Sequence, residues 1–180
     1  MAKKTIFILG GARSGKSHFA QELAKKLSGK VLFVATGEPL DEEMQARIAE
    51  HKKARPKNWR TLEIPTGIGK KIARQIGDAE VVIIDCLTLL VSNLLRDEPD
   101  YPEAEKRVIS EINELIAVMN KLNTSFIIVS NEVGMGIVPE TRLGRIYRDM
   151  LGKANQLIAR HATEVYFMIA GIPIKVGIGP

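Results

Sequence analysis

The segment GGARSGKS, residues 10–17, places glycines, a lysine and a serine in the order G-x-x-x-x-G-K-S. The glycines of such a loop allow a tight turn, so that successive backbone N–H groups point at phosphate oxygens. Lys16 would reach the outer phosphates and Ser17 their magnesium ion. Because an apolar run precedes the segment and a helical pattern follows it, we predict a nucleoside triphosphate site rather than a chance glycine-rich turn. Its expected lining is Gly10, Gly11, Ala12, Arg13, Ser14, Gly15, Lys16 and Ser17, although Arg13 could equally be a solvated loop residue.

A carboxylate suited to the same magnesium ion occurs in the segment VVIIDC. Asp85 ends this apolar run, which is the place of a Walker B acid. The alternative is that Asp85 caps the helix that follows, since aspartate is favoured at that position. The adjacent Cys86 is more typical of a small buried hydrophobe than of a nucleophile, and we assign it no chemistry. We therefore predict that Ser17 and Asp85 hold Mg²⁺.

His51 lies in a basic segment that also contains Arg47, Lys52, Lys53, Arg55 and Arg60. Met44, Ile48 and His51 fall at i, i+4 and i+7, so periodicity alone favours a partly buried structural histidine. Pro56 ends the helix just after this residue. We expect the surrounding cations to lower the pKa of His51 and to stabilise a bound phosphate. Both effects would favour a neutral imidazole that attacks phosphorus.

These candidate residues are separated by alternating strand and helix patterns. Strands are expected at 5–10, 31–37, 60–64, 81–86, 125–130, 164–170 and 173–178. Helices are expected at 17–27, 41–53, 68–76, 87–95, 102–122 and 143–161. Uniformly apolar strands separated by helices indicate a mostly parallel sheet covered on both faces, and hence an α/β fold. The length fits one catalytic domain over residues 1–180.

The composition favours an acidic small-molecule partner. The net charge is +5, but 21 acidic residues are mixed among 26 basic ones, and only 5% of residues are aromatic. The chain therefore has few aromatic side chains on which the bases of a nucleic acid could stack. The apolar runs are too short for a secretory signal or a membrane span. A single cysteine excludes an intrachain disulfide and points to the cytoplasm. We expect neither nucleic acid nor membrane as a partner.

Four segments together resemble the bifunctional adenosylcobinamide kinase / adenosylcobinamide-phosphate guanylyltransferase family of cobalamin biosynthesis. They are GGARSGKS, VATGEPLDEEMQARIAEHKKARPKNWRTLE, IIDCLTLLVSNLL and VSNEVGMGIVPETRLGRIYRDMLGKANQLIA. The resemblance implies a RecA-like P-loop fold in three α/β/α layers, and a homotrimer with sites between subunits. It also implies two activities: phosphorylation of adenosylcobinamide by ATP or GTP, and transfer of GMP from GTP to the resulting phosphate.

In this family a histidine in the pattern R-I-x-x-H-x-x-x-R-P carries the guanylyl group, and the pattern is matched here by Arg47, Ile48, His51, Arg55 and Pro56. The resemblance thus makes His51 the favoured nucleophile, with Lys16 as the second catalytic residue. A second histidine that some members have just before it is replaced here by Glu50. Further positions that match guanine nucleotide contacts are Thr36, Gly37, Glu38, Lys52, Lys53, Ala54, Arg55, Glu63 and Asp85.

Glu63 also has a physical reason to contact guanine, since a carboxylate can accept from both N1–H and the 2-amino group. Without the resemblance, a solvated carboxylate at a strand edge would be the more ordinary interpretation.

The loop after the strand at 125–130 leaves the expected carboxyl edge of the sheet, where such folds bind ligands. Asn131 and Glu132 could polarise water or substrate there, or could only satisfy backbone groups. Arg142, Arg145 and Arg148 form a basic helical face that is either solvated or in contact with a subunit or a substrate phosphate. Two other functions stay open: a P-loop kinase of another metabolite, and a RecA-like nucleic-acid ATPase.

Overall fold

A computed structural model describes residues 3–177 of the chain. Its strands are β1 (Thr5–Gly10), β2 (Val31–Ala35), β3 (Arg60–Glu63), β4 (Val81–Asp85), β5 (Ser125–Val129), β6 (Glu164–Ile169) and β7 (Ile172–Val176). Its helices are α1 (Lys16–Leu27), α2 (Glu42–Ala54), α3 (Ile68–Gln75), α4 (Leu87–Leu94), α5 (Tyr101–Lys121) and α6 (Arg142–His161). The expected elements are all confirmed, with ends that shift by one or two residues. Residue 178 of the strand expected at 173–178 lies outside the described residues.

The strands form one sheet in the order β3-β2-β4-β5-β1-β6-β7. All neighbours are parallel except β6 and β7, which form an antiparallel hairpin. The predicted mostly parallel sheet is therefore confirmed. Because parallel strands end at a common edge, the segments after β1, β2, β4 and β5 meet there, and these are the segments that hold the predicted site.

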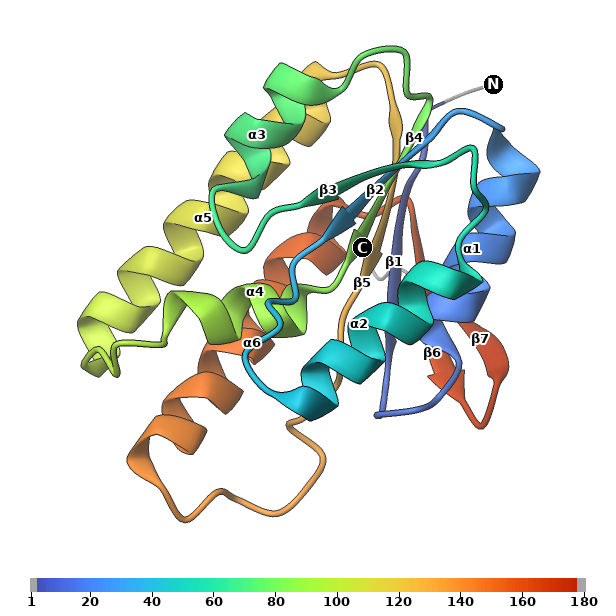
Figure 1. Ribbon diagram of the computed structural model, residues 1–180. Helices are drawn as coiled ribbons and strands as arrows, with labels where there is room; N and C mark the ends of the chain where they lie inside the picture. Colours follow the sequence, from blue (N-terminus) through green and yellow to red (C-terminus); the bar gives the residue numbers. More distant parts are fainter. Residues whose placement is uncertain (1–2, 178–180) are drawn as a thin grey trace.

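Helices cover both faces of the sheet, as the apolar strands require (Figure 1). On one face α3, α4, α5 and α6 enclose a large core that includes Phe7, Val34 and Phe126. On the other face α1 packs against a second cluster that includes Ile8, Phe33 and Trp59. The edge strands β3 and β7 are mostly exposed, which their charged residues and proline allow.

Side-chain hydrogen bonds cap the N-termini of α2 and α6, two helices next to the predicted site. Asp41 accepts a hydrogen bond of 2.7 Å from the N–H of Met44 at the start of α2, and Thr141 accepts one of 3.1 Å from Gly144 at the start of α6. Helix α2 ends where Arg55 adopts an extended conformation before Pro56, as the sequence predicts. Among the described residues, no helix is both long and apolar enough to cross a bilayer.

Candidate active site

The loop between β1 and α1 has the form of a phosphate cradle. Gly15 lies in the left-handed region with φ 91°, and α1 begins directly after it. Lys16 is 8% exposed, and its Nζ donates to the carbonyl of Gly11 at 2.5 Å and lies 3.4 Å from Oγ of Ser14. Burial lowers the pKa of Lys16, while Cys86 and Asp85 act in the opposite direction. The ammonium group therefore lies inside the loop, where a phosphate would replace these internal contacts.

The β6–β7 hairpin supports this loop from outside. The N–H of Gly171 donates to the carbonyl of Ser14 at 3.1 Å. A Cβ at Gly10, whose φ is 153°, would lie 2.6 Å from the carbonyl oxygen of Met168. Gly10 is therefore required by packing against β6 as well as by the turn. The spacing of the motif does not reveal this packing requirement.

Asp85 ends β4 beside the loop, and its side chain is 11% exposed. Its charge raises the pKa of both Lys16 and His51, so it is within electrostatic reach of the phosphate loop and of α2. The chemistry of the set fits a magnesium site, because a serine hydroxyl and one carboxylate are the few protein oxygens that Mg²⁺ uses beside phosphates. Among residues 3–177 no cluster of three or more His, Cys, Asp or Glu residues could hold a metal alone. A magnesium ion here would depend on the nucleotide.

His51 lies on α2 with its Nδ1 atom 3.7 Å from Oδ2 of Asp85, and its side chain is 43% exposed. It is partly buried beside Met44 and Ile48, as the helical period predicts. The expected pKa shift is wrong in sign: the carboxylate of Asp85 raises the pKa of His51, and burial and Arg55 oppose it only in part. The physical reason is the fold, which brings the Asp85 carboxylate to the ring while Lys52 pairs with Glu63 and Arg55 stacks on Phe33.

Arg55 is half-buried, and its guanidinium group stacks on the ring of Phe33, with 3.7 Å between Cζ and the ring centroid. Its Nε and Nη1 atoms are buried and have no hydrogen-bond partner among the described residues. Burial lowers the pKa of Arg55, and Asp85 and Glu63 counteract this. Guanidinium groups stay charged in proteins, so these donors are suited to an anion that enters from outside.

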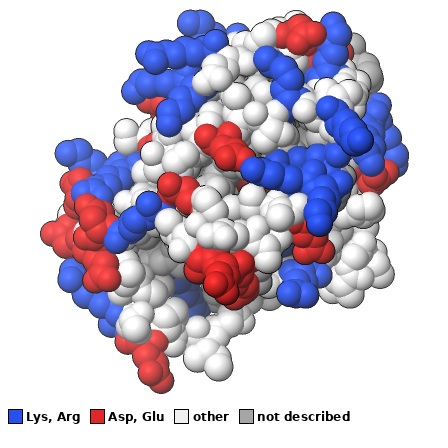
Figure 2. Space-filling view, in the orientation of Figure 1, with Lys and Arg blue, Asp and Glu red and all other residues white. Residues whose placement is uncertain are grey.

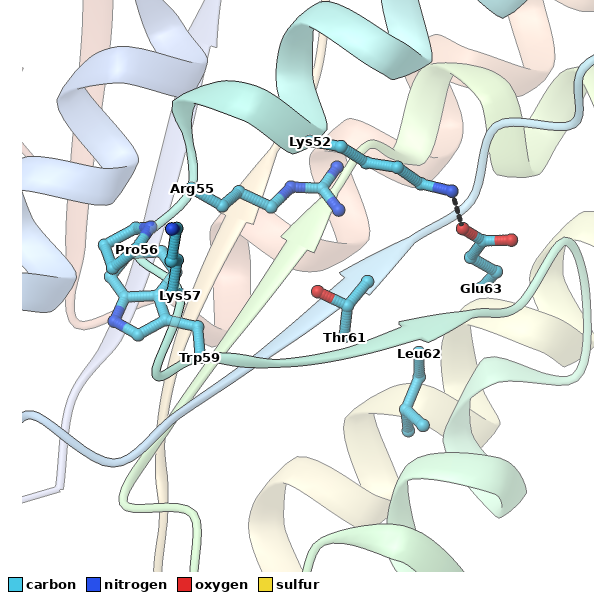
Figure 3. Close-up of a pocket in the computed structure, with 8 residues that line it drawn as sticks. All are labelled: Lys52, Arg55, Pro56, Lys57, Trp59, Thr61, Leu62 and Glu63. Carbon is cyan, nitrogen blue, oxygen red and sulfur yellow. Dashed lines mark ion pairs between the residues drawn. The ribbon is translucent and has the colours of Figure 1, made fainter.

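An open pocket of about 590 Å³ lies between the end of α2 and β3. Its lining is Lys52, Arg55, Pro56, Lys57, Trp59, Thr61, Leu62 and Glu63. Figure 3 shows the Lys52 ammonium group directed at the Glu63 carboxylate, with which it forms an ion pair. Glu63 is exposed at the edge strand, so the pocket lining includes a carboxylate as well as Arg55, whose Nε and Nη1 have no described partner. Lys53 is also exposed on α2, while the side chains of Arg47 and Ala54 lie outside what the structure describes.

The segment after β2 is tied to the neighbouring strand and helix. Thr36 is fully buried, and its hydroxyl donates to the carbonyl of Cys86 at 2.7 Å and accepts from the Cys86 N–H at 2.9 Å. Asn93 donates to the Thr36 carbonyl at 2.8 Å, and Arg96 forms an ion pair with Glu38. The Thr36 hydroxyl thus holds the sheet edge together, and a ligand would meet the half-buried Gly37 and Glu38 instead.

The start of the loop after β5 is hydrogen-bonded to the phosphate loop. The N–H of Glu132 donates to the carbonyl of Gly10 at 3.1 Å. The Glu132 carboxylate accepts from the N–H of Gly134 at 2.6 Å, which is the backbone role left open by the sequence. Arg145 donates to the carbonyls of Pro139 and Glu140, and Arg148 to that of Gly134. These arginines hold the loop in place, so the basic helical face is only partly solvated.

Several residues of the site carry no clear sequence signal. Phe33 belongs to a uniformly apolar strand, and nothing in that run indicates that its ring supports Arg55. Asn93 is a polar residue inside the apolar run LTLLVSNLL, and this contrast could have indicated that its side chain has a hydrogen-bond partner. Cys86 is partly buried, and burial raises its pKa to about 11, so it stays a thiol as expected.

Charges of both signs cover the face seen in Figure 2. Acidic groups interrupt the basic ones, unlike the continuous basic stripe that is typical of a nucleic-acid site. Ion pairs such as Lys52–Glu63 and Arg96–Glu38 likewise bring opposite charges together on the protein. The positive net charge is therefore not concentrated on this face.

Comparisons with known proteins find similarity over nearly the whole chain. Residues 6–176 match the family model described as cobinamide kinase / cobinamide phosphate guanyltransferase. The bifunctional adenosylcobalamin biosynthesis protein CobU of Escherichia coli (strain K12) is 43% identical over 179 residues, covering 95% of this chain and 98% of the relative. CobU of Salmonella typhimurium is 40% identical over 179 residues, with the same coverage. CobP of Pseudomonas aeruginosa is 40% identical over 168 residues, covering 93% of this chain and 94% of the relative.

A solved structure described as an ATPase domain has a similar fold. It superimposes with a TM-score of 0.53 at 15% sequence identity, covering 92% of this chain and 69% of that one. At this identity the likeness shows the fold alone. It confirms the RecA-like P-loop architecture expected from the sequence.

Proposed function

Because the chain belongs to the cobinamide kinase / cobinamide phosphate guanyltransferase family, we propose that it catalyses both reactions of the family's name. In the first reaction, ATP or GTP phosphorylates the aminopropanol hydroxyl of adenosylcobinamide. In the second, GMP moves from GTP to that phosphate, pyrophosphate is released, and adenosylcobinamide-GDP is formed. The geometric observation that supports the guanylyl step most is the contact of Asp85 with His51, in which Oδ2 lies 3.7 Å from Nδ1.

In the kinase step the chain mainly supplies position and charge. Backbone N–H groups of residues 10–17 would hold the phosphates, and Lys16 would offset the charge that develops on the transferred group. Ser17 and Asp85 would hold a magnesium ion with the nucleotide. Bound there, Mg²⁺ would neutralise phosphate charge.

In the guanylyl step the imidazole of His51 attacks the α-phosphorus of GTP and pyrophosphate leaves. The phosphorus–nitrogen bond is then broken by an oxygen of the substrate phosphate, which takes over the GMP group. Two in-line displacements of this kind retain the configuration at phosphorus. The unpaired donors of Arg55 and the exposed Lys52 and Lys53 would hold the nucleotide's phosphates during the exchange.

The pocket beside β3 is suited to the guanine base. Glu63 could accept hydrogen bonds from N1–H and the 2-amino group, which adenine does not offer. For this the Lys52–Glu63 ion pair has to open or to shift to one carboxylate oxygen. An exposed pair of this kind is worth less than about 1 kcal/mol, so the rearrangement costs little.

A homotrimer with sites between subunits and a cytoplasmic location complete the proposal. The trimer predicts a mass in solution three times that of the 19.9 kDa chain, and light scattering measures it directly. The single cysteine suits a reducing compartment.

The test of the activities uses purified protein, Mg²⁺ and adenosylcobinamide, with products identified by mass spectrometry. With ATP we expect adenosylcobinamide phosphate, and with GTP added we expect adenosylcobinamide-GDP. The variant Lys16→Met should lose the kinase step, whereas Lys26→Met, on the exposed end of α1, should keep it. If no corrinoid is phosphorylated and ATP hydrolysis responds to DNA in a salt-sensitive way, the RecA-like ATPase replaces this proposal.

A further inference from the structure

The two nitrogens of the His51 ring have different surroundings. Nδ1 faces Asp85, with 3.7 Å between it and Oδ2, while Nε2 lies on the opposite side of the ring. In a neutral imidazole one nitrogen bears the proton and the other keeps the lone pair, and the hydrogen-bond partner of one decides the arrangement. A carboxylate accepts and cannot donate, so it favours a proton on the nitrogen that faces it. At 3.7 Å the two atoms are in ion-pair contact, slightly longer than a hydrogen bond, and a proton on Nδ1 would leave the lone pair on Nε2.

The carboxylate of Asp85 belongs to a rigid part of the fold, whereas His51 does not. Asp85 is paired in register with Ala35 of β2 and Val129 of β5, and the N–H of Thr36 donates to its carbonyl at 3.2 Å. No described residue of α2 is fully buried, so packing of this helix does little to fix the ring. A contact with the fixed carboxylate of Asp85 would orient the His51 ring.

On the basis of the guanylyl-transfer route proposed above, we infer that Asp85 is a positioning residue that keeps the His51 proton on Nδ1, so that GMP is carried on Nε2. The Nε2 lone pair forms the new bond to the α-phosphorus, and the bond to the pyrophosphate oxygen breaks with its electron pair. The proton stays on Nδ1, and the ring of the adduct becomes a cation that faces the Asp85 carboxylate. When the substrate phosphate attacks, the phosphorus–nitrogen electron pair returns to Nε2.

This role is separate from a magnesium-binding role of the same side chain. The carboxylate has two oxygens, so the contact of Oδ2 with His51 Nδ1 at 3.7 Å leaves Oδ1 for a metal ion. Loss of a metal ligand alone would slow the reaction without changing the nitrogen that reacts. Loss of the orienting acceptor would change the nitrogen as well.

The deciding experiment locates the bond in the intact protein. Protein labelled with ¹⁵N-histidine is incubated with Mg²⁺ and GTP, and ³¹P–¹⁵N coupling identifies the nitrogen attached to phosphorus. We expect the Nε2 adduct. An Nδ1 adduct would overturn the inference and leave the covalent route intact, whereas no adduct at all would overturn the covalent route and the inference with it.

Asp85→Asn provides the second measurement, because it has nearly the same shape and its folding can be checked by thermal unfolding. We expect adduct formation to slow by about tenfold or more and the product to contain both Nε2 and Nδ1 adducts. A slow variant that forms only the Nε2 adduct would show that Asp85 acts through the metal or the nucleotide, and would overturn its positioning role. Should the variant fail to fold, the wild-type measurement still decides the identity of the nitrogen.

Discussion

The carbonyl oxygen of Met168 in β6 lies so close to Gly10 of the phosphate loop that a Cβ there would be 2.6 Å away. The same Cβ would lie 2.8 Å from Oγ of Ser14, and the φ of 153° is one that other residues rarely adopt. The phosphate loop therefore has its shape because a strand from the far end of the chain packs against it.

Gly10→Ala should consequently destabilise the nucleotide-free protein by about 2 kcal/mol or more, since it combines overpacking with backbone strain. Gly11→Ala is the matched control, because a Cβ at Gly11 would meet no atom within 4 Å. Urea unfolding of both variants without nucleotide measures the difference. Equal stability of the two variants would show that the β6 contact does not restrain the loop.

Glu164→Gln tests the contacts at the start of β6, the first strand of the β6–β7 hairpin. The carboxylate of Glu164 accepts from Lys4 at 2.8 Å, from Tyr166 at 2.8 Å and from Lys175 at 3.2 Å, and these contacts lower its pKa from 4.5 to about 2. A lowered pKa contributes stability that is fully present above 4.5 and disappears as the pH falls through about 2. Because the side chains of Lys4 and Lys175 are 45% and 61% exposed, solvent screens these contacts, and we expect only about 1 kcal/mol at pH 7.

The measurement is the free energy of unfolding of wild type and Glu164→Gln between pH 7 and pH 2. Their difference should shrink as the pH falls below 5, while Glu22→Gln, in an exposed helical pair with Lys25, should change little at any pH. A difference that does not depend on pH would mean that the charge of Glu164 is not the source of the effect.

Glu63→Gln tests base recognition in the pocket. The amide keeps one acceptor and adds a donor that faces N1–H of guanine, so the affinity for GTP should fall by about tenfold, while ATP binding stays within about twofold. Glu22→Gln is the control, because that carboxylate pairs with Lys25 on α1 and is not among the residues that line the pocket. Calorimetric titration with both nucleotides gives the answer, and an equal loss for ATP and GTP would argue against guanine recognition by Glu63.

Arg55→Met tests whether the unpaired guanidinium group serves a ligand. In the free protein, loss of the stacking on Phe33 is offset by removal of buried donors without partners, so stability should change by less than about 1 kcal/mol. The affinity for GTP should fall by about tenfold or more, because charge-assisted hydrogen bonds are lost. Arg74→Met, on the exposed face of α3, should bind GTP normally. Unchanged binding by Arg55→Met would assign Arg55 a purely structural role.

The fold and the phosphate loop could be predicted because both depend on local patterns. Apolar strand runs, the helical periods and the order G-x-x-x-x-G-K-S are visible within short windows, and the structure places them as expected. Asp85 at the end of its strand followed from the same reasoning. The bounds of α2 were also predictable, since Asp41 and Pro56 mark its two ends.

The electrostatics of His51 could not be predicted in this way. The sequence places five basic residues near it, but the fold pairs Lys52 with Glu63 and stacks Arg55 on Phe33. Asp85, 34 positions further along the chain, is the group that lies against the ring and raises its pKa. Charge counted along a sequence is therefore a poor guide where long-range contacts decide the neighbours.

The central claim is that His51 carries the guanylyl group. Protein incubated with Mg²⁺ and GTP labelled at the α-phosphate is denatured and examined by intact mass and by the acid lability of the bound label. We predict an acid-labile GMP adduct in wild type and none in His51→Ala. A folded wild-type protein that binds GTP but forms no adduct, or an adduct that persists in His51→Ala, would contradict the account and leave His51 a structural residue of a P-loop kinase.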